Sequence, residues 1–244
     1  MRIDTYFTVP EVDGAELMGA TVVVIDVVRS TTSIVEALAN GARDIFPTES
    51  TEDAVRLVSS LGREDSLLCG EQKAEKIEGF DLGNSPGDFT RDVVGDKKLV
   101  MNVTYATRAL RLAQEGDRVL PCALTNLGAV AAEVSSARYI SIICAGHEDT
   151  FSLDDALCVG HLIERILSKP RGKKDEDPEL NDASRAVRAL AQARKPTKRF
   201  LSLAAAGRTV SGVGLEDDLA ICADVDRHDV VVEMIDQSIT RAGA

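Results

Sequence analysis

The chain is poor in the residues that commonly build metal centres or covalent cross-links. It has no tryptophan, three histidines and five cysteines, with no Cys-x-x-Cys pair. An odd number of scattered cysteines fits reduced core thiols and argues against a disulfide framework or a zinc site. The histidines show no metal-ligand spacing, and His161 falls in a predicted helix, where we expect a structural role. The cysteines are Cys69, Cys122, Cys144, Cys158 and Cys222.

Long apolar runs and an excess of positive charge are also missing. No apolar stretch approaches the ~20 residues that span a bilayer, and no secretory signal is expected, so we predict no membrane partner and a cytoplasmic location. With 40 acidic and 28 basic residues the net charge is −12, which argues against a nucleic-acid partner. An anionic ligand would therefore need local positive groups, which draws attention to single arginines. The oligomeric state is left open, with a homodimer as one option.

Strand and helix patterns alternate along the chain, which predicts an α/β fold. We expect a three-layer α/β/α arrangement with a mostly parallel or mixed sheet of repeated β-turn-α units. We expect the chain to form a single domain over 1–244, and this domain could consist of two similar halves. The charged, proline-bracketed stretch near 169–180 predicts a surface loop. Strands are predicted near 21–28, 43–47, 66–69, 98–103, 117–121, 138–144 and 229–235, and helices near 31–40, 51–61, 106–115, 126–135, 153–168, 182–194 and 214–222.

The most informative stretch is the strand-to-helix junction at 21–32. The apolar run 22–25 predicts a buried strand, and a helix begins shortly after it. A helix N-terminus stabilises anions, Arg29 suits phosphate, carboxylate or sulfonate, and Asp26 could hold a divalent cation. The alternative is an Asp26–Arg29 salt bridge beside an ordinary capped helix. The hydroxyl residues that open this helix are Ser30, Thr31 and Thr32.

Two other stretches add polar groups at the expected sheet edge. Glu71 ends a predicted strand and so should face the same edge as Asp26, although a solvated loop acid is the alternative. The turn-rich run 79–86 contributes Asn84 and Ser85, which fit ligand donors as well as a turn and a helix cap.

The stretch 102–108 echoes the first junction 76 residues later, with Asn102 in the place of Asp26 and Thr107 in the place of Thr31. Thr104 and Thr107 cap or open a helix. Arg108 stands in its first turn, which is electrostatically unfavourable without a nearby anion. It is therefore a candidate anion clamp, with a salt bridge to an acid as the alternative.

A fourth stretch follows the strand near 138–144. Ser152 resembles a helix N-cap with Asp155 at the capping-box position, which explains Asp155 but not Asp154, a candidate metal ligand or acid. The pair 217–218 is expected to be a solvated helix start. The chain lacks a P-loop, a dinucleotide fingerprint, a nucleophile elbow and a zinc-protease motif.

Together these stretches resemble the 2-phosphosulfolactate phosphatase family. The motifs occur in the family's order, the run 79–86 is the most specific of them, and a weaker echo lies at 218–224. The matching segments are 25–32, 39–42, 70–71, 79–86, 107–110, 144–146 and 151–155.

The resemblance implies an α/β/α enzyme that uses Mg²⁺ to hydrolyse (2R)-2-phospho-3-sulfolactate to sulfolactate and phosphate, a step of coenzyme M biosynthesis in some organisms. The partner would be a small anionic phosphorylated substrate. The expected catalytic residues are Asp26, Glu71, Arg29 and Arg108. The expected substrate-binding residues are Ser30, Thr31, Thr32, Asn84, Ser85, Thr104 and Thr107. The expected metal ligands are Asp26, Glu71, Asp154 and Asp155, and the base that activates water is left open among the carboxylates.

Two positions depart from the family's usual pattern. Tyr105-Ala106 stand where an Asn-Gly pair is usual, and Gln72 stands where an arginine is common. Both changes could reshape the substrate pocket. The alternatives are therefore a phosphatase of another phosphorylated hydroxy acid, and a phosphate- or sulfonate-binding relative without turnover.

Overall fold

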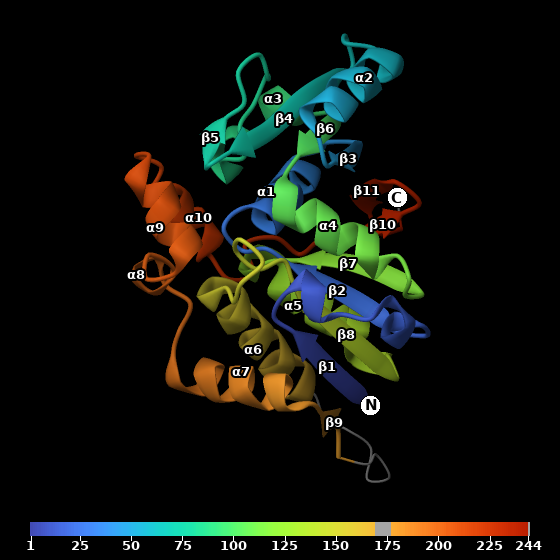
Figure 1. Cartoon of the computed structure of the whole chain (residues 1–244), viewed down its shortest axis with the longest axis vertical. Helices are drawn as coiled ribbons and strands as arrows, with labels where there is room; N and C mark the ends of the chain where they lie inside the picture. The colour runs from blue at the N-terminus through green and yellow to red at the C-terminus, as the bar shows by residue number, and fades with distance from the viewer. Residues whose placement is uncertain (169–176, 244) are drawn as a thin grey trace.

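The computed structural model describes residues 1–168 and 177–243. Most of the surface loop predicted near 169–180 lies outside these residues, and the end of that stretch forms strand β9 (Glu179–Leu180). Within the described ranges one mixed sheet of 11 strands runs in the order β5-β4-β6-β3-β11-β10-β7-β2-β8-β1-β9. Figure 1 shows this sheet as two groups of strands with helices packed around them.

The first group of strands is parallel and contains the first junction. Strand β2 (Thr21–Ile25) lies between β7 (Arg118–Cys122) and β8 (Tyr139–Cys144), and β8 is followed by β1 (Arg2–Tyr6) and β9. The second group is also parallel, with β6 (Lys98–Asn102) between β3 (Asp44–Thr48) and β4 (Ser66–Gln72).

Antiparallel strands complete the sheet. The hairpin of β10 (Val232–Ile235) and β11 (Ser238–Arg241) joins the two groups, pairing with β7 on one side and with β3 on the other. Strand β5 (Glu75–Lys76) pairs with the end of β4. The predicted mixed sheet is confirmed. Its antiparallel strands are β5 and the C-terminal hairpin, and of these only β10 was predicted.

Helices cover both faces of the sheet. Val23 and Ile25 of β2 point into a core shared with α5 (Leu127–Glu133) and α6 (Leu153–Leu167). Val22 and Val24 point into the opposite core, shared with α1 (Ser30–Ala39) and α4 (Thr104–Ala113). Because successive strand residues face opposite sides, this alternation confirms the predicted three-layer α/β/α arrangement.

The remaining helices flank these layers. Helix α2 (Thr51–Leu61) covers a smaller core on β4 and β6, and α7 (Asp182–Ala193) packs on α6. The helix predicted near 214–222 is the shorter α10 (Asp218–Cys222), preceded by α8 (Lys198–Leu201) and α9 (Ala205–Gly212), and α3 is a single turn (Arg91–Val94). No helix in the described part is long and apolar enough to cross a membrane. All five cysteines are buried and free, as predicted.

Candidate active site

A cavity of about 500 Å³ lies where β2 and β4 end and where α6 begins. Residues of α9 form another part of its wall. Its acidic lining residues outnumber its basic ones, so an anion would be repelled unless a cation entered with it. The acidic residues are Asp26, Glu71, Glu148 and Asp154, and the basic ones are Lys73 and His147.

Asp26 follows β2 directly and is 7% exposed. Burial and the charges of Asp154 and Glu71 raise the pKa of Asp26 to about 7, while hydrogen bonds from Ser30 oppose the rise. Ser30 opens α1 and lines the cavity beside Asp26. The first junction therefore brings a carboxylate with a near-neutral pKa to the N-terminus of a helix.

Two neighbouring aspartates open α6, and their contacts correct one prediction. The hydroxyl of Ser152 donates to Asp154 rather than capping the helix, so the predicted capping box is wrong. Asp155 instead accepts the backbone N–H groups of Val27 (2.8 Å) and Gly146 (3.3 Å), which ties the ends of β2 and β8 together. Burial raises the pKa of both aspartates.

The hydroxyls of Thr31 and Thr32 hold the turn between β2 and α1. Thr31 donates to the carbonyl of Asp26 (2.8 Å) and Thr32 to that of Val27 (2.7 Å), and both threonines are fully buried. Of the hydroxyl residues predicted to bind substrate at this junction, the structure places Ser30 on the cavity and puts these two inside the turn.

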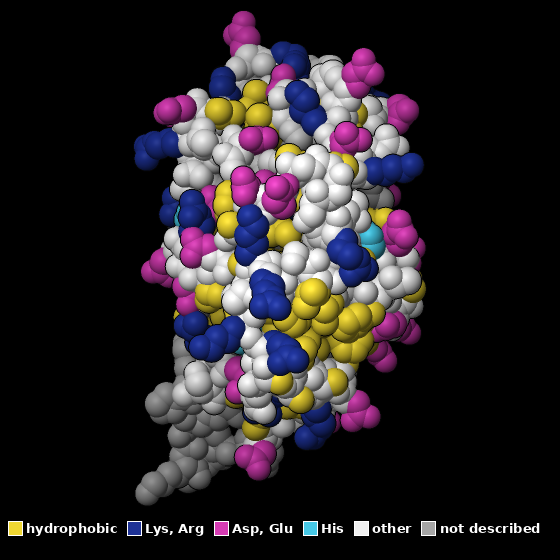
Figure 2. All heavy atoms as spheres, turned by 90° about the vertical axis from the view of Figure 1, so that its left-hand side faces the viewer, with side chains coloured by type: hydrophobic (Ala, Val, Ile, Leu, Met, Phe, Trp, Pro, Cys, Tyr) yellow, Lys and Arg dark blue, Asp and Glu magenta, His cyan; other side chains and the backbone are white. Residues whose placement is uncertain are grey.

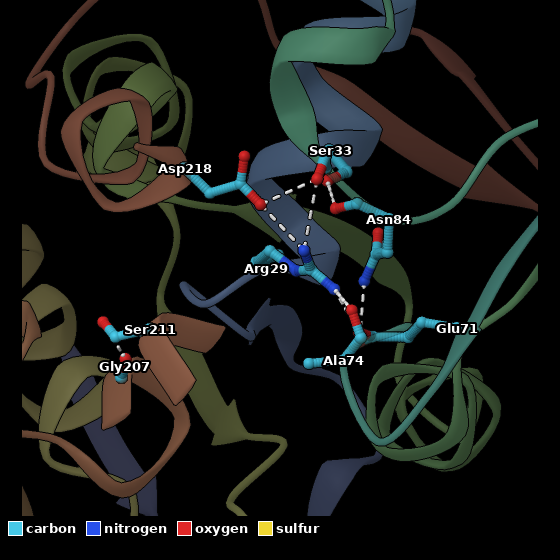
Figure 3. A network of polar contacts seen from close by, with 9 residues as sticks. Arg29, Ser33, Glu71, Ala74, Asn84, Gly207, Ser211 and Asp218 are labelled. Carbon is cyan, nitrogen blue, oxygen red and sulfur yellow. Dashed lines mark hydrogen bonds and ion pairs between the residues drawn. The ribbon is translucent and has the colours of Figure 1, made fainter. Parts of the chain in front are cut away.

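Arg29 is the centre of a set of contacts between four segments, which we call the Arg29 network (Figure 3). One terminal nitrogen donates to Asp218 of α10 (2.7 Å) and Ser85 (3.3 Å), and the other to the carbonyl of Ala74 (2.8 Å) and to Glu71. Asn84 donates to the second oxygen of Glu71 (3.0 Å), and Ser85 to Asp218 (2.8 Å). The network consists of Arg29, Glu71, Ala74, Asn84, Ser85 and Asp218.

This network changes the interpretation of several predicted residues. The Arg29 side chain is 1% exposed, and its guanidinium pairs with the carboxylates of Glu71 and Asp218. It does not form the salt bridge with Asp26 that was considered as the alternative. Asn84 and Ser85 bind within the same network. The Arg29 Nε and Asn84 Oδ1 atoms are buried without a hydrogen-bond partner among the described residues.

The second junction does not repeat the chemistry of the first. Asn102 and Thr107 are buried and bind the carbonyl of Thr48 (3.2 and 3.3 Å), which joins β6 and α4 to β3. Arg108 pairs with Asp149 at 2.7 Å on the surface, which is the salt bridge considered as its alternative. The side chain of Thr104, the first residue of α4, lies outside the described part.

Several residues of the site escaped the sequence analysis. Lys73 lies on the exposed turn between β4 and β5, and His147 follows Gly146, the last residue of a quoted motif. Asp218 was assigned to a solvated helix start, although it lies in the weaker echo near the C-terminus. The position of His147 directly after that motif was a signal that could have placed it in the site. Nothing in the local sequence indicated that Asp218 reaches Arg29.

The fold and the cavity define an α/β enzyme whose acidic site suits cation-assisted chemistry on a small anion. Comparison with known proteins narrows this class. The family described as 2-phosphosulpholactate phosphatase matches residues 6–237. The chain belongs to the 2-phosphosulfolactate phosphatase family and is a phosphoric monoester hydrolase.

Individual relatives match nearly the full length of the chain. A protein of Clostridium novyi (strain NT) named probable 2-phosphosulfolactate phosphatase is 36% identical over 99% of this chain and 100% of its own. Similarly named proteins of Caldanaerobacter subterraneus and of a Synechococcus strain are each 35% identical, covering 96% and 98% of this chain and 95% and 98% of their own.

Proposed function

We propose that this chain is a magnesium-dependent phosphatase that hydrolyses (2R)-2-phospho-3-sulfolactate to sulfolactate and phosphate. The observation that carries the proposal is the acidic cavity, in which Asp26 and Asp154 are buried together with raised pKa values. The family and the printed names of the relatives support the substrate.

The carboxylates of the cavity suit Mg²⁺ better than they suit a metal ion that is coordinated by protein side chains alone. Among residues 1–168 and 177–243, no three His, Cys, Asp or Glu side chains form a ready metal-binding group. Mg²⁺ commonly takes one or two carboxylates and completes its shell with water and substrate phosphate. Asp26 and Asp154 would be those carboxylates. The other predicted ligands are engaged elsewhere, Glu71 in the Arg29 network and Asp155 on backbone N–H groups.

When bound, Mg²⁺ would neutralise phosphate oxygens and stabilise the charge of in-line transfer to water. The residues of the chain would orient the phosphate, accept a proton and hold the site in place. The N-terminus of α1, with Ser30 at the cavity, would orient the phosphate. Where Mg²⁺ takes only one of the two carboxylates, the other one of Asp26 and Asp154 is suited to accept the proton of the attacking water, because burial raises the pKa of both. The Arg29 network would hold Glu71 and the end of β4 in place.

Phosphate release from synthetic 2-phosphosulfolactate tests the proposal. We expect release with Mg²⁺, loss of release after treatment with a chelator, and recovery when Mg²⁺ is added back. The (2S) enantiomer serves as the matched control substrate and should be hydrolysed more slowly. Tight binding of 2-phosphosulfolactate without release in Mg²⁺ or any other divalent metal would contradict the proposal and favour a binding protein.

A further inference from the structure

The loop between β8 and α6 has an unusual, well-anchored conformation. Glu148 and Asp149 adopt positive φ angles of 52° and 57°, and Gly146 adopts 73°. His147 and Thr150 exchange backbone hydrogen bonds of 3.0 Å across the turn, and the Thr150 hydroxyl also donates to the carbonyl of His147. Positive φ angles in residues other than glycine are uncommon, so these contacts fix a conformation that the chain would otherwise avoid.

Helix α4 fastens this loop from the side. The hydroxyl of Tyr105 lies near the backbone N–H of Glu148, and Arg108 pairs with Asp149 at 2.7 Å. The rings of Tyr105 and His147 lie 5.9 Å apart between centroids and are tilted by 56°. Helix α4 therefore contacts both the His147 imidazole and the loop that carries it.

The His147 imidazole is one of two basic side chains in a cavity lining that contains four acidic ones. His147 and Tyr105 are half-buried and line the cavity with Asp26 and Asp154, whereas Lys73 is exposed on a hairpin turn. His147 lies near enough to Asp154 for their charges to interact. A substrate acid that enters beside the phosphate would share the cavity with these four carboxylates. The His147 imidazole offers a donor already ordered for such a group, which lowers the entropy cost of binding.

We propose that His147, positioned by Tyr105, binds the acidic group of the substrate that is not transferred and thereby selects which phosphate esters are accepted. This inference rests on the proposed phosphatase function. It assigns the carboxylate or sulfonate end of the substrate to the loop between β8 and α6. Tyr105 acts as a positioning residue, because it touches His147 and the loop.

Four phosphate esters separate the possibilities: 2-phosphosulfolactate, 2-phospholactate, the phosphate ester of 2-hydroxyethanesulfonate, and isopropyl phosphate. They carry both acids, the carboxylate, the sulfonate and neither acid, respectively. For His147→Ala we expect KM to rise about 10-fold or more for whichever acid the imidazole binds, with kcat within about 3-fold. For isopropyl phosphate, KM should stay within about 2-fold of the wild-type value.

Matched variants separate recognition from loop stability. Tyr105→Phe keeps the ring and should retain most discrimination, whereas Tyr105→Ala should reproduce part of the His147→Ala effect. Arg108→Ala removes an exposed ion pair with Asp149 and leaves Tyr105 against His147, so it should change KM by less than about 2-fold for all four esters. His161→Ala, a histidine substitution on α6 away from the cavity, should change none of them.

The outcomes are distinguishable. An equal fall in kcat for all four esters would overturn the inference and indicate a role in the chemical step. Equal KM changes for all esters, or an Arg108→Ala pattern identical to that of His147→Ala, would also overturn it. If the wild type hydrolyses none of the esters, the proposed function fails. Calorimetry of sulfolactate binding in the presence of Mg²⁺ then tests the inference separately. The inference predicts weaker binding by His147→Ala than by the wild type, and it fails if the two proteins bind equally.

Discussion

At the scale of single residues, the pKa values in the cavity are set mainly by burial. No arginine or lysine of the described residues pairs with Asp26, because Arg29 turns away to Glu71 and Asp218. Its ionised form is therefore costly until a cation arrives. This explains how a carboxylate and an arginine only three positions apart have separate tasks.

We expect Asp26→Asn to abolish most phosphate release while leaving the fold intact. The amide can neither accept the proton of water nor bind Mg²⁺ as a carboxylate does, so kcat should fall by about 10²–10⁴-fold. Single-turnover phosphate release measures the effect, and circular dichroism checks the fold. Asp217→Asn is the control, because that side chain is fully exposed. Near-normal turnover of Asp26→Asn would remove Asp26 from both roles.

We expect Arg29→Ala to destabilise the protein by about 3–5 kcal/mol, because it leaves the carboxylates of Glu71 and Asp218 without their buried partner. Arg56→Ala is the control. Its ion pair with Asp53 is exposed (78% and 54%), so the change should stay within about 0.5 kcal/mol. Urea unfolding measures both free energies. Similar small losses in the two variants would show that the Arg29 network contributes little to stability.

The residues that the sequence analysis found share one property: each follows a recognisable strand or opens a helix. Asp26, Glu71 and Asp154 were identified in this way, because the carboxyl ends of parallel strands meet at one edge. The partners of Arg29 were not, since Asp218 lies 189 residues further along the chain. Local pattern also could not show that Thr31 and Thr107 would use their hydroxyls on backbone carbonyls.

At the scale of elements, burial separates what could be predicted from what could not. Strands such as β2 and β8 are apolar along most of their length, which gives a clear signal. Strand β1 mixes charged and apolar residues, and β9 has two residues, so neither produces one. The short helices α8 and α9 bury a few residues each, although α9 forms part of the cavity wall.

The contact between α6 and α7 gives a prediction at this scale. A Cβ atom on Gly160 would lie 2.1 Å from the carbonyl oxygen of Val187, so Gly160→Ala must push the two helices apart. We expect a loss of about 1–3 kcal/mol, which corresponds to roughly 2–12 °C in Tm for a chain of this size. Gly212→Ala, at the end of α9 with open space around it, should be neutral or slightly stabilising. Thermal unfolding compares the two. An equal effect at both glycines would show that the helix contact is not tight.

At the scale of the whole molecule, the site joins parts of the fold that the sheet itself joins weakly. The two parallel groups of strands are connected through the β10–β11 hairpin, which pairs with each group at a single position. Arg29 follows β2 of one group, Glu71 belongs to β4 of the other, and Asp218 opens α10. The Arg29 network therefore fastens both groups and the C-terminal helices beside the cavity.

The overall charge is distributed unevenly around this site. Although the net charge is −12, basic side chains gather among apolar ones on the side that carries α8 and α9 (Figure 2). Lys198, Arg199 and Arg208 are exposed on these helices. Positive groups near the cavity wall favour the approach of an anionic substrate to an acidic protein. Under the proposed function the acidic cavity itself still requires a cation.

That requirement leads to a prediction about pH and metal for the molecule as a whole. The pKa of Asp26 is about 7 in the folded protein and ordinarily 3.8, so the folded state holds this proton more tightly. Its contribution to stability is present below about pH 4 and is lost as the pH rises to about 7. We therefore expect the metal-free protein to lose stability across this window, and Asp26→Asn to lose less than Asp217→Asn.

Mg²⁺ should reverse the loss, because it replaces the proton as the partner of the cavity carboxylates. At about 100 times its Kd, a ligand that binds only the folded state contributes about 2.7 kcal/mol, or roughly 5–11 °C in Tm for a chain of this size. We expect that shift at pH 8 and a much smaller one at pH 5, at the same Mg²⁺ concentration, because protons then compete for Asp26 and Asp154. Thermal unfolding with Mg²⁺ and with a chelator at both pH values measures it. A shift of the same size at both pH values, or one retained by Asp26→Asn, would place the bound metal outside the cavity.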